Sequence, residues 1–356
     1  MSDPIDKVKP AVRAIGAYTL RPDRTTIKLN QNENPFDMPE AIKDEVMRRI
    51  AGRPWSRYPD FDPIDLLEKL ATFSGWRADG ILAGNGSNEL IEALLMTTVS
   101  PSTRVVIPTP TFTLYQLMVR ILGGEAVETP LTDSLEFDVT EIQSQITEEK
   151  ADIVILCSPN NPTGCTIAES DLRSLLESSS GLVVVDEAYH EFSRSTVVPL
   201  LKEFKNLVVL RTFSKAMAAA GLRIGYLLAS PELVTQINKA RLPYNLNFFS
   251  HTVAEVAVEK FELLSPLIDE MTSERDRMFD ELKSIRGLAP VPSKANFMVV
   301  KTSISPKVVF DEMLKRDILI RDVSKYPMLG NYFRFSVGTP EENNAFIQAL
   351  KDIFIH

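Results

Sequence analysis

The chain has 356 residues, of which 44% are hydrophobic and 24% charged, with a net charge of -9 and a pI near 5.1. This composition is ordinary for a globular protein long enough for two lobes, and it excludes a disordered chain. The negative charge argues against a general affinity for nucleic acid or an anionic membrane, so we expect small-molecule partners.

The N-terminal segment lacks the basic start and apolar core of a secretory signal. No apolar run approaches the roughly 20 residues that span a bilayer. Cys157 and Cys165 flank SPNNPTG in neither a CxxC nor a zinc-ligand arrangement, and the three histidines lie far apart in the sequence. We therefore expect a cytoplasmic protein with reduced thiols and no metal site.

Short apolar runs predict strands over residues 103–108, 152–157, 181–187, 206–211 and 223–229. Each run is too continuous to leave one face in water, and the segments between runs are mostly long enough for crossover helices. The pattern predicts an α/β core, a mostly parallel sheet sandwiched by helices.

After Leu246 the sequence changes to a long helical pattern that reaches about Ile285, followed by shorter strands near 295–300 and 332–338. These elements predict a smaller α+β lobe, which the N-terminal arm joins. The expected division of the chain is an arm and part of the small domain over residues 1–45, a large domain over 46–246, and a small C-terminal domain over 247–356.

Polar loops accompany the predicted strands: SPNNPTG, DEAYHEF and TFSK follow three of them, and GNGSNE precedes the first. Ligands bind beyond the carboxyl ends of strands in open parallel sheets. We therefore expect the four loops to converge on one site.

GNGSNE opens a predicted helix, with Gly84 and Gly86 for a tight turn and Ser87 as the N-cap. The amides of Ser87, Asn88 and Glu89 would then face an anion such as a phosphate, although simple helix capping explains the same residues. The third glycine of a dinucleotide fingerprint is absent and no P-loop motif occurs, which disfavours NAD and ATP.

Asp186 follows four apolar residues at the end of a predicted strand. A buried carboxylate is costly unless it is paired, so the expected partner is a cation. The pair is either a salt bridge or helix cap, or a carboxylate that holds a protonated ring nitrogen. Tyr189 directs its hydroxyl to the same site or packs in the core.

Lys215 lies between Thr212 and Ser214 on one side and an apolar stretch that ends at Arg223 on the other. A lysine in a polar loop is commonly a solvated charge, but this setting favours a neutral amine of lowered pKa. Such lysines form Schiff bases with aldehydes. The neighbouring hydroxyls and the arginine would supply donors for a phosphate.

Ten motifs, taken together, resemble the fold-type I pyridoxal-phosphate enzymes, specifically class II aminotransferases of the histidinol-phosphate aminotransferase type. The resemblance covers nearly the whole chain. The motifs are LNQNENPF (29–36), RYPD (57–60), GNGSNE (84–89), PTFTLY (110–115), NNPTG (160–164), DEAY (186–189), TFSK (212–215), GLRIGY (221–226), ANF (295–297) and FRFSVGT (333–339).

The resemblance implies that pyridoxal 5'-phosphate is the cofactor and that Lys215 binds it as a Schiff base and acts as the general acid and base. Asp186 would pair with the ring nitrogen, Asn161 and Tyr189 would bind the ring oxygen, and Phe112 would stack on the ring. The implied phosphate contacts are Ser87, Asn88, Glu89, Thr212, Ser214, Arg223 and, across a homodimer with shared active sites, the partner subunit's Tyr58.

For the substrate, the resemblance implies that Arg334 binds the anionic group near the reacting carbon, with Arg321 and Tyr18 as distal contacts and Asn34 in the same pocket. The implied reaction transfers an amino group between L-histidinol phosphate and 2-oxoglutarate in histidine biosynthesis.

Three alternatives stay open from the sequence: an aromatic or broad-specificity aminotransferase, a threonine-phosphate decarboxylase-like lyase of the same fold, and a ligand sensor fused to a DNA reader. No basic helix-turn-helix segment precedes the core, which disfavours the sensor. Met217 and Ala218 replace an aromatic residue and a glycine that are usual in the family, and we expect small changes in packing there.

Overall fold

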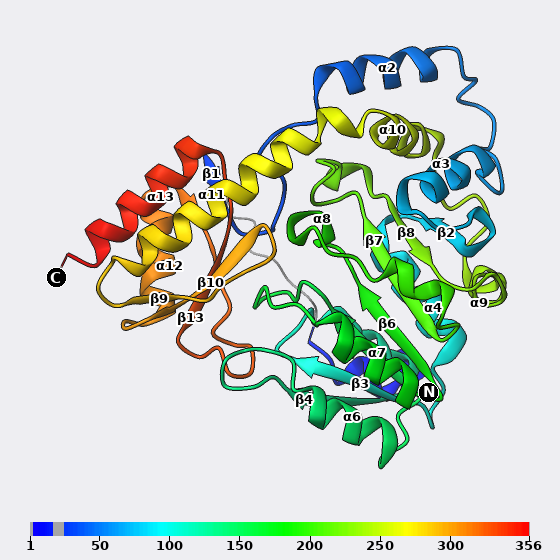
Figure 1. The fold of residues 1–356 in the computed structure, drawn as a ribbon, viewed down its shortest axis with the longest axis horizontal. Coiled ribbons are helices and arrows are strands. Elements are labelled where there is room, and N and C mark those ends of the chain that lie inside the picture. Colours follow the sequence, from blue (N-terminus) through cyan, green and yellow to red (C-terminus); the bar gives the residue numbers. More distant parts are fainter. Residues whose placement is uncertain (1–2, 17–24, 356) are drawn as a thin grey trace.

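A mixed sheet of seven strands forms the centre of the larger lobe in a computed structural model that describes residues 3–16 and 25–355 (Figure 1). Neighbouring strands pair in parallel from β7 to β4, whereas β8 runs antiparallel to both β7 and β2. The strands in spatial order are β2 (Ile81–Gly84), β8 (Gly225–Leu228), β7 (Leu207–Thr212), β6 (Leu182–Asp186), β5 (Ile153–Cys157), β3 (Arg104–Thr109) and β4 (Glu125–Pro130).

Both faces of this sheet are covered, because successive side chains of a strand point to opposite faces. In β6, Val183 and Val185 belong to one apolar cluster and Val184 to the other. Helices α2 (Glu40–Ala51), α3 (Ile64–Ser74), α6 (Val139–Thr147), α7 (Glu169–Ser178) and α10 (Phe248–Glu259) bury side chains in the first cluster, and α4 (Gly86–Thr98), α5 (Leu114–Leu122) and α9 (Pro231–Ile237) in the second.

The smaller lobe contains an antiparallel sheet with the strand order β12 (Arg321–Asp322), β13 (Tyr332–Ser336), β10 (Phe297–Thr302) and β9 (Leu288–Pro290). In the N-terminal segment, β1 (Ile27–Lys28) pairs in parallel with β11 (Ile318–Leu319), so this part of the arm joins the smaller lobe. Helices α11 (Ser265–Lys283), α12 (Pro306–Lys315) and α13 (Pro340–Ile353) pack their apolar side chains into its core. Two four-residue helices, α1 (Pro10–Arg13) and α8 (His190–Ser193), complete the α-helices of the described residues.

The predicted α/β class with a smaller α+β lobe is confirmed, and each predicted strand run contains a strand. The long helix expected after Leu246 is instead two helices, α10 and α11, separated by a short 3₁₀ helix at Phe261–Leu263. Pro266 lies in the first turn of α11, where a proline is tolerated because its missing N–H has no partner to lose. Since α10 packs against α2 and α3, it lies on the larger lobe, whereas the predicted division at residue 246 assigned it to the small domain.

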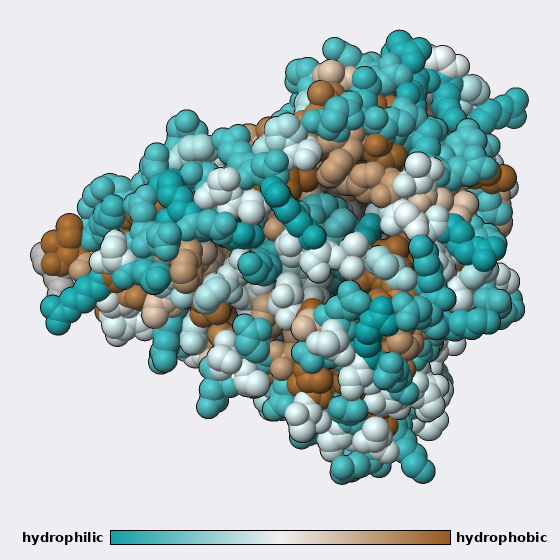
Figure 2. All heavy atoms as spheres, viewed as in Figure 1, coloured by the Kyte–Doolittle hydropathy of each residue, from teal (hydrophilic) through white to brown (hydrophobic). Residues whose placement is uncertain are grey.

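The face of the molecule that is seen in Figure 2 is mostly hydrophilic, with apolar side chains scattered among the polar ones. Among residues 3–16 and 25–355, no helix combines the length and the apolar character needed to cross a membrane.

Candidate active site

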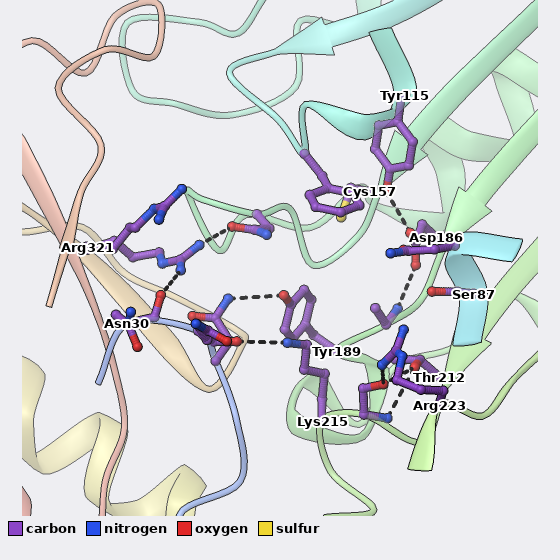
Figure 3. A pocket seen from close by; sticks show the side chains of 18 of the residues that line it. Asn30, Ser87, Tyr115, Cys157, Asp186, Tyr189, Thr212, Lys215, Arg223 and Arg321 are labelled. Atoms are coloured by element: carbon purple, nitrogen blue, oxygen red, sulfur yellow. Dashed lines mark hydrogen bonds between the residues drawn. The ribbon is translucent and has the colours of Figure 1, made fainter. Parts of the chain in front are cut away.

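A cavity of about 290 Å³ lies at the carboxyl ends of three parallel strands (Figure 3). The last residues of β5, β6 and β7, which are Cys157, Asp186 and Thr212, all line it. The other lining residues are Asn30, Gln31, Asn32, Ser87, Asn88, Phe112, Tyr115, Asn161, Ala188, Tyr189, Ser214, Lys215, Arg223, Arg321, Tyr326 and Arg334. The expected convergence of the four polar loops is therefore observed.

At one end of the cavity, two glycines let the start of α4 approach Arg223. Gly86 has a φ of +77°, and a Cβ atom there would lie 2.6 Å from Nη2 of Arg223. A Cβ atom on Gly225 would lie 2.4 Å from the backbone nitrogen of Ser87. The helix begins at Gly86 after the cap residue Asn85, so Ser87 is not the N-cap that we expected. Its N–H lies in the first turn of α4, where backbone N–H groups have no acceptor within the helix.

Hydroxyl groups from the end of β7 complete this end of the cavity. Thr212 Oγ1 and Arg223 Nη1 each donate a hydrogen bond of 3.0 Å to Ser214 Oγ. A guanidinium, several hydroxyls and a helix N-terminus thus face one small space. This set of donors suits a phosphate group. We call these phosphate donors, which are Ser87, Thr212, Ser214 and Arg223, the phosphate cradle.

Asp186 is buried and lines the same cavity, and its carboxylate accepts hydrogen bonds from two donors. Tyr115 donates from its hydroxyl to Oδ2 at 2.6 Å, and the N–H of Ala188 donates to Oδ1 at 3.0 Å. Burial raises the pKa of Asp186 to about 6, while the Tyr115 and Ala188 hydrogen bonds oppose the increase. Near neutral pH the group is therefore an anion that can hold a cationic nitrogen.

Lys215 extends toward the middle of the cavity, where its Nζ donates to the backbone carbonyl of Gln31 at 2.9 Å and lies 5.8 Å from the centre of the Tyr189 ring. Burial lowers its pKa to about 8, and the positive charge of Arg334 acts in the same direction. A substantial fraction of this amine is neutral near pH 8, as a nucleophile or a proton acceptor requires.

Asn32, Asn161 and Arg334 line the same cavity as the lysine. Asn32 Nδ2 donates to the Tyr189 hydroxyl at 3.0 Å. Arg334 donates from Nη1 to Asn161 Oδ1 at 2.5 Å and from Nη2 to the carbonyl of Asn30 at 2.8 Å. These bonds fix the guanidinium at the wall of the cavity.

Arg321 and Arg334 face each other across β12 and β13 as direct register partners. Directly opposed residues of an antiparallel pair project from the same face of the sheet, and like charges in that position repel. Both side chains line the cavity, and Arg321 lies on the opposite side from Asp186 and Arg223 (Figure 3). A pair of arginines placed in this way suits an anionic substrate.

Among the described residues, three predicted site residues, Glu89, Tyr58 and Asn34, do not line the cavity of this chain. The Glu89 carboxylate turns away and accepts hydrogen bonds from the Asn85 N–H at 2.5 Å and from Asn245 Nδ2 at 2.9 Å. Tyr58 is 81% exposed and stacks on Tyr244. Tyr18 lies outside the described residues.

The expectation that Asn34 lines this pocket is wrong for this structure. Its side chain donates to the carbonyl of Ala216 at 3.1 Å and lines a neighbouring surface depression. The chain turns at Asn32, whose φ of +55° lies in the left-handed region that asparagine tolerates. Asn32 therefore contacts the cavity where Asn34 was expected.

Tyr115 and Asn32 also line the cavity and were not among the predicted site residues, although both lie inside the family motifs. Tyr115 follows Phe112 by three residues, and the two rings meet edge to face with centroids 5.5 Å apart. The i, i+3 spacing of two aromatic residues at a helix start was the available signal.

The three parts of the cavity match the functional groups of pyridoxal 5'-phosphate. Its phosphate fits the donors around Arg223, its ring nitrogen the buried Asp186, and its aldehyde the amine of Lys215. The fold and the site together define a pyridoxal-phosphate-dependent enzyme.

The chain belongs to the aminotransferase class I and II family, whose pattern matches residues 24–350. It is 39% identical to a histidinol-phosphate aminotransferase from Chlorobium phaeovibrioides over 96% of each chain. Two solved structures carrying the same enzyme name share the fold. The one from Clostridium acetobutylicum has a TM-score of 0.85 at 25% identity and covers 92% of this chain and 99% of its own. The one from Sinorhizobium meliloti, in complex with pyridoxal-5'-phosphate, has a TM-score of 0.88 at 24% identity and covers 98% of both chains.

Proposed function

We propose that this enzyme transfers the amino group between L-histidinol phosphate and 2-oxoglutarate, giving imidazole acetol phosphate and glutamate, as a step of histidine biosynthesis. The observation that carries the proposal is the opposed pair Arg321 and Arg334 on one wall of the cavity, with Lys215 close to Arg334. The names of the relatives at 35–39% identity support the same substrate.

One pocket must accept both partners in this reaction. Histidinol phosphate carries a phosphate where glutamate carries its α-carboxylate, and the planar fork of Arg334 suits either anion. Arg321 then meets the distal carboxylate of glutamate. The polar side chain of Asn30, which lines the cavity on the same side, leaves room for an imidazole.

When bound, pyridoxal phosphate supplies an electron sink for the negative charge that develops at the substrate carbon. Lys215 Nζ would remove the proton from that carbon and hold it for delivery to a different atom, a role that its lowered pKa supports. Asp186 would hold the ring nitrogen, and the donors at Ser87, Asn88, Thr212, Ser214 and Arg223 would hold the phosphate. Tyr189 and Asn161 would bind the ring oxygen, and Phe112 would pack against the ring.

The enzyme acts as a homodimer in which the partner's Tyr58 completes each site. Trp55, Tyr58 and Leu242 are 78%, 81% and 72% exposed, and large exposed apolar side chains that gather on a surface mark an interface. The same surface adjoins the cradle, since Asn85 and Glu89 of that loop bond to Asn245, next to Tyr244. Two buried free thiols, Cys157 and Cys165, fit a reducing compartment, and we place the enzyme in the cytoplasm.

The test compares kcat/KM for L-histidinol phosphate, phenylalanine and tyrosine with 2-oxoglutarate as acceptor. We expect histidinol phosphate to give the highest value. In the matched variant Arg321→Ala, glutamate should lose more than phenylalanine, which carries no distal charge. A higher value for phenylalanine or tyrosine would assign the chain to the aromatic aminotransferases, and release of carbon dioxide from threonine phosphate would make it a lyase.

A further inference from the structure

Tyr115 connects the two groups of the site that face the cofactor ring. It is fully buried in the first turns of α5, and its hydroxyl donates to Oδ2 of Asp186 at 2.6 Å. Its ring lies edge to face against Phe112, at an interplanar angle of 85°. One side chain thus contacts both the carboxylate that holds the ring nitrogen and the aromatic ring that covers the cofactor.

The surroundings of Asp186 make this hydroxyl important for the charge of the carboxylate. Burial and the nearby Glu187 raise the pKa of Asp186, whereas Tyr115, the Ala188 N–H and Lys215 lower it. The Cys157 thiol also faces this group, but burial raises its pKa far above the ordinary value, so it is neutral. Burial likewise holds the pKa of Tyr115 well above its usual range, so the hydroxyl keeps its proton and donates at every working pH.

Resting on the proposed function, we propose that Tyr115 is a positioning residue that keeps Asp186 ionised and directed at the ring nitrogen of pyridoxal phosphate. A neutral donor suits this task better than a cation. A lysine or arginine in its place would form an ion pair with Asp186 and compete with the protonated ring nitrogen for the same charge. The phenol hydroxyl occupies one lone pair of the carboxylate and the Ala188 N–H a second, which leaves acceptor sites for the ring nitrogen.

The proposal is tested with Tyr115→Phe in the full-length protein. This variant removes the hydroxyl and keeps the ring against Phe112. Tyr226→Phe is the matched control, because Tyr226 is also a buried tyrosine and its hydroxyl contacts Arg211 instead of Asp186. Two quantities are measured from about pH 5 to 9. These are the pKa of the Asp186 carboxyl, by NMR of carboxyl-labelled aspartate assigned with Asp186→Asn, and the dissociation constant of pyridoxal 5'-phosphate.

In Tyr115→Phe, the pKa of Asp186 should rise by about one to two pH units, the shift expected when a charged group loses one hydrogen bond. Cofactor affinity should then fall by up to about tenfold per pH unit below the raised pKa and return to within about threefold of wild type at high pH. Tyr226→Phe should match wild type in both measurements.

An unchanged Asp186 pKa in Tyr115→Phe would overturn the proposal. So would an affinity loss of equal size at every pH, because that pattern reports damaged packing. Failure of the proposed function has a different signature. Wild type would then turn over no amino donor, while the shifted Asp186 pKa in Tyr115→Phe would still support the link between these two residues.

Discussion

Arg334 and Asn161, 173 positions apart in the chain, are joined by a hydrogen bond of 2.5 Å from Nη1 to Oδ1. Arg334 belongs to β13 of the smaller lobe, whereas Asn161 lies in the loop after β5 of the larger lobe. The second hydrogen bond of Arg334, to the carbonyl of Asn30, adds the N-terminal segment. The proposed substrate anion site is therefore assembled from three parts of the chain, and it depends on their relative placement.

Replacing Arg334 by alanine should lower kcat/KM about tenfold to more than a hundredfold for both histidinol phosphate and glutamate, because a hydrogen bond to a charged group contributes about 1.5 to 3 kcal/mol. Arg334→Lys should fall between alanine and wild type, since lysine keeps the charge but loses the planar fork. Steady-state kinetics with both substrates measure the effect. Equal kcat/KM values for Arg334→Ala and wild type would exclude Arg334 from the anion site.

Lys215→Ala should still bind pyridoxal phosphate weakly but lose at least about 10²- to 10⁴-fold in turnover, because no other described side chain donates an amine at that position. Reduction with borohydride followed by mass spectrometry should attach the cofactor to Lys215 in wild type and leave the variant unlabelled. Substantial steady-state transamination by the variant without added amine would contradict the assignment.

Asp186→Asn should lose most activity, because a neutral amide no longer favours the protonated ring nitrogen. In the cofactor-free wild-type protein, affinity for pyridoxal phosphate should fall as the pH drops through about 6, where the raised pKa of Asp186 places its protonation. Cofactor titrations from pH 5 to 9 would show this loss in wild type. Near-normal turnover by Asp186→Asn would remove the residue from the mechanism.

Mixing two inactive variants tests the shared active site. A Tyr58→Phe protomer keeps its own Lys215, and a Lys215→Ala protomer contributes an intact Tyr58, so one site of each hybrid dimer is complete. An equal mixture after subunit exchange should regain about a quarter of the wild-type sites. Activity and sedimentation of the mixture measure this recovery, and a fully active wild-type monomer would disprove the arrangement.

Glu191→Gln should stabilise the protein at pH 8 and have little effect at pH 5. Burial raises the pKa of Glu191 from 4.5 to about 8, so the folded protein keeps a proton that the unfolded chain releases. The contribution of this protonated carboxyl to the free energy of unfolding is fully present below about pH 4.5 and is lost as the pH rises toward 8. The melting temperature, measured at both pH values, should rise by a few degrees for the variant at pH 8 only. The same difference at both pH values would show that packing, not ionisation, is responsible.

The α/β core was predictable because strands that are buried on both faces consist of continuous apolar residues. Such runs can be recognised from the local sequence alone. Lys215 and Asp186 were predictable for a related reason, since a charge placed against an apolar strand is costly unless it has a function or a partner. The same signal does not give strand direction. The run that contains β8 is as apolar as its neighbours, yet it pairs antiparallel to β7, and only its connection and packing decide that.

The amino-acid sequence by itself determined the layers of the fold, the family, and most of the polar residues that line the cavity. Tertiary structure decided which of two asparagines in one motif enters the site, because the turn at Asn32 carries Asn34 elsewhere. It also brought the Tyr115 hydroxyl within hydrogen-bond distance of Asp186. In the same way, Lys215 and Arg334 came to donate hydrogen bonds to the backbone carbonyls of Gln31 and Asn30, respectively. Every residue has a carbonyl, so residue type carries no signal for such contacts, which exist only once distant segments are packed together.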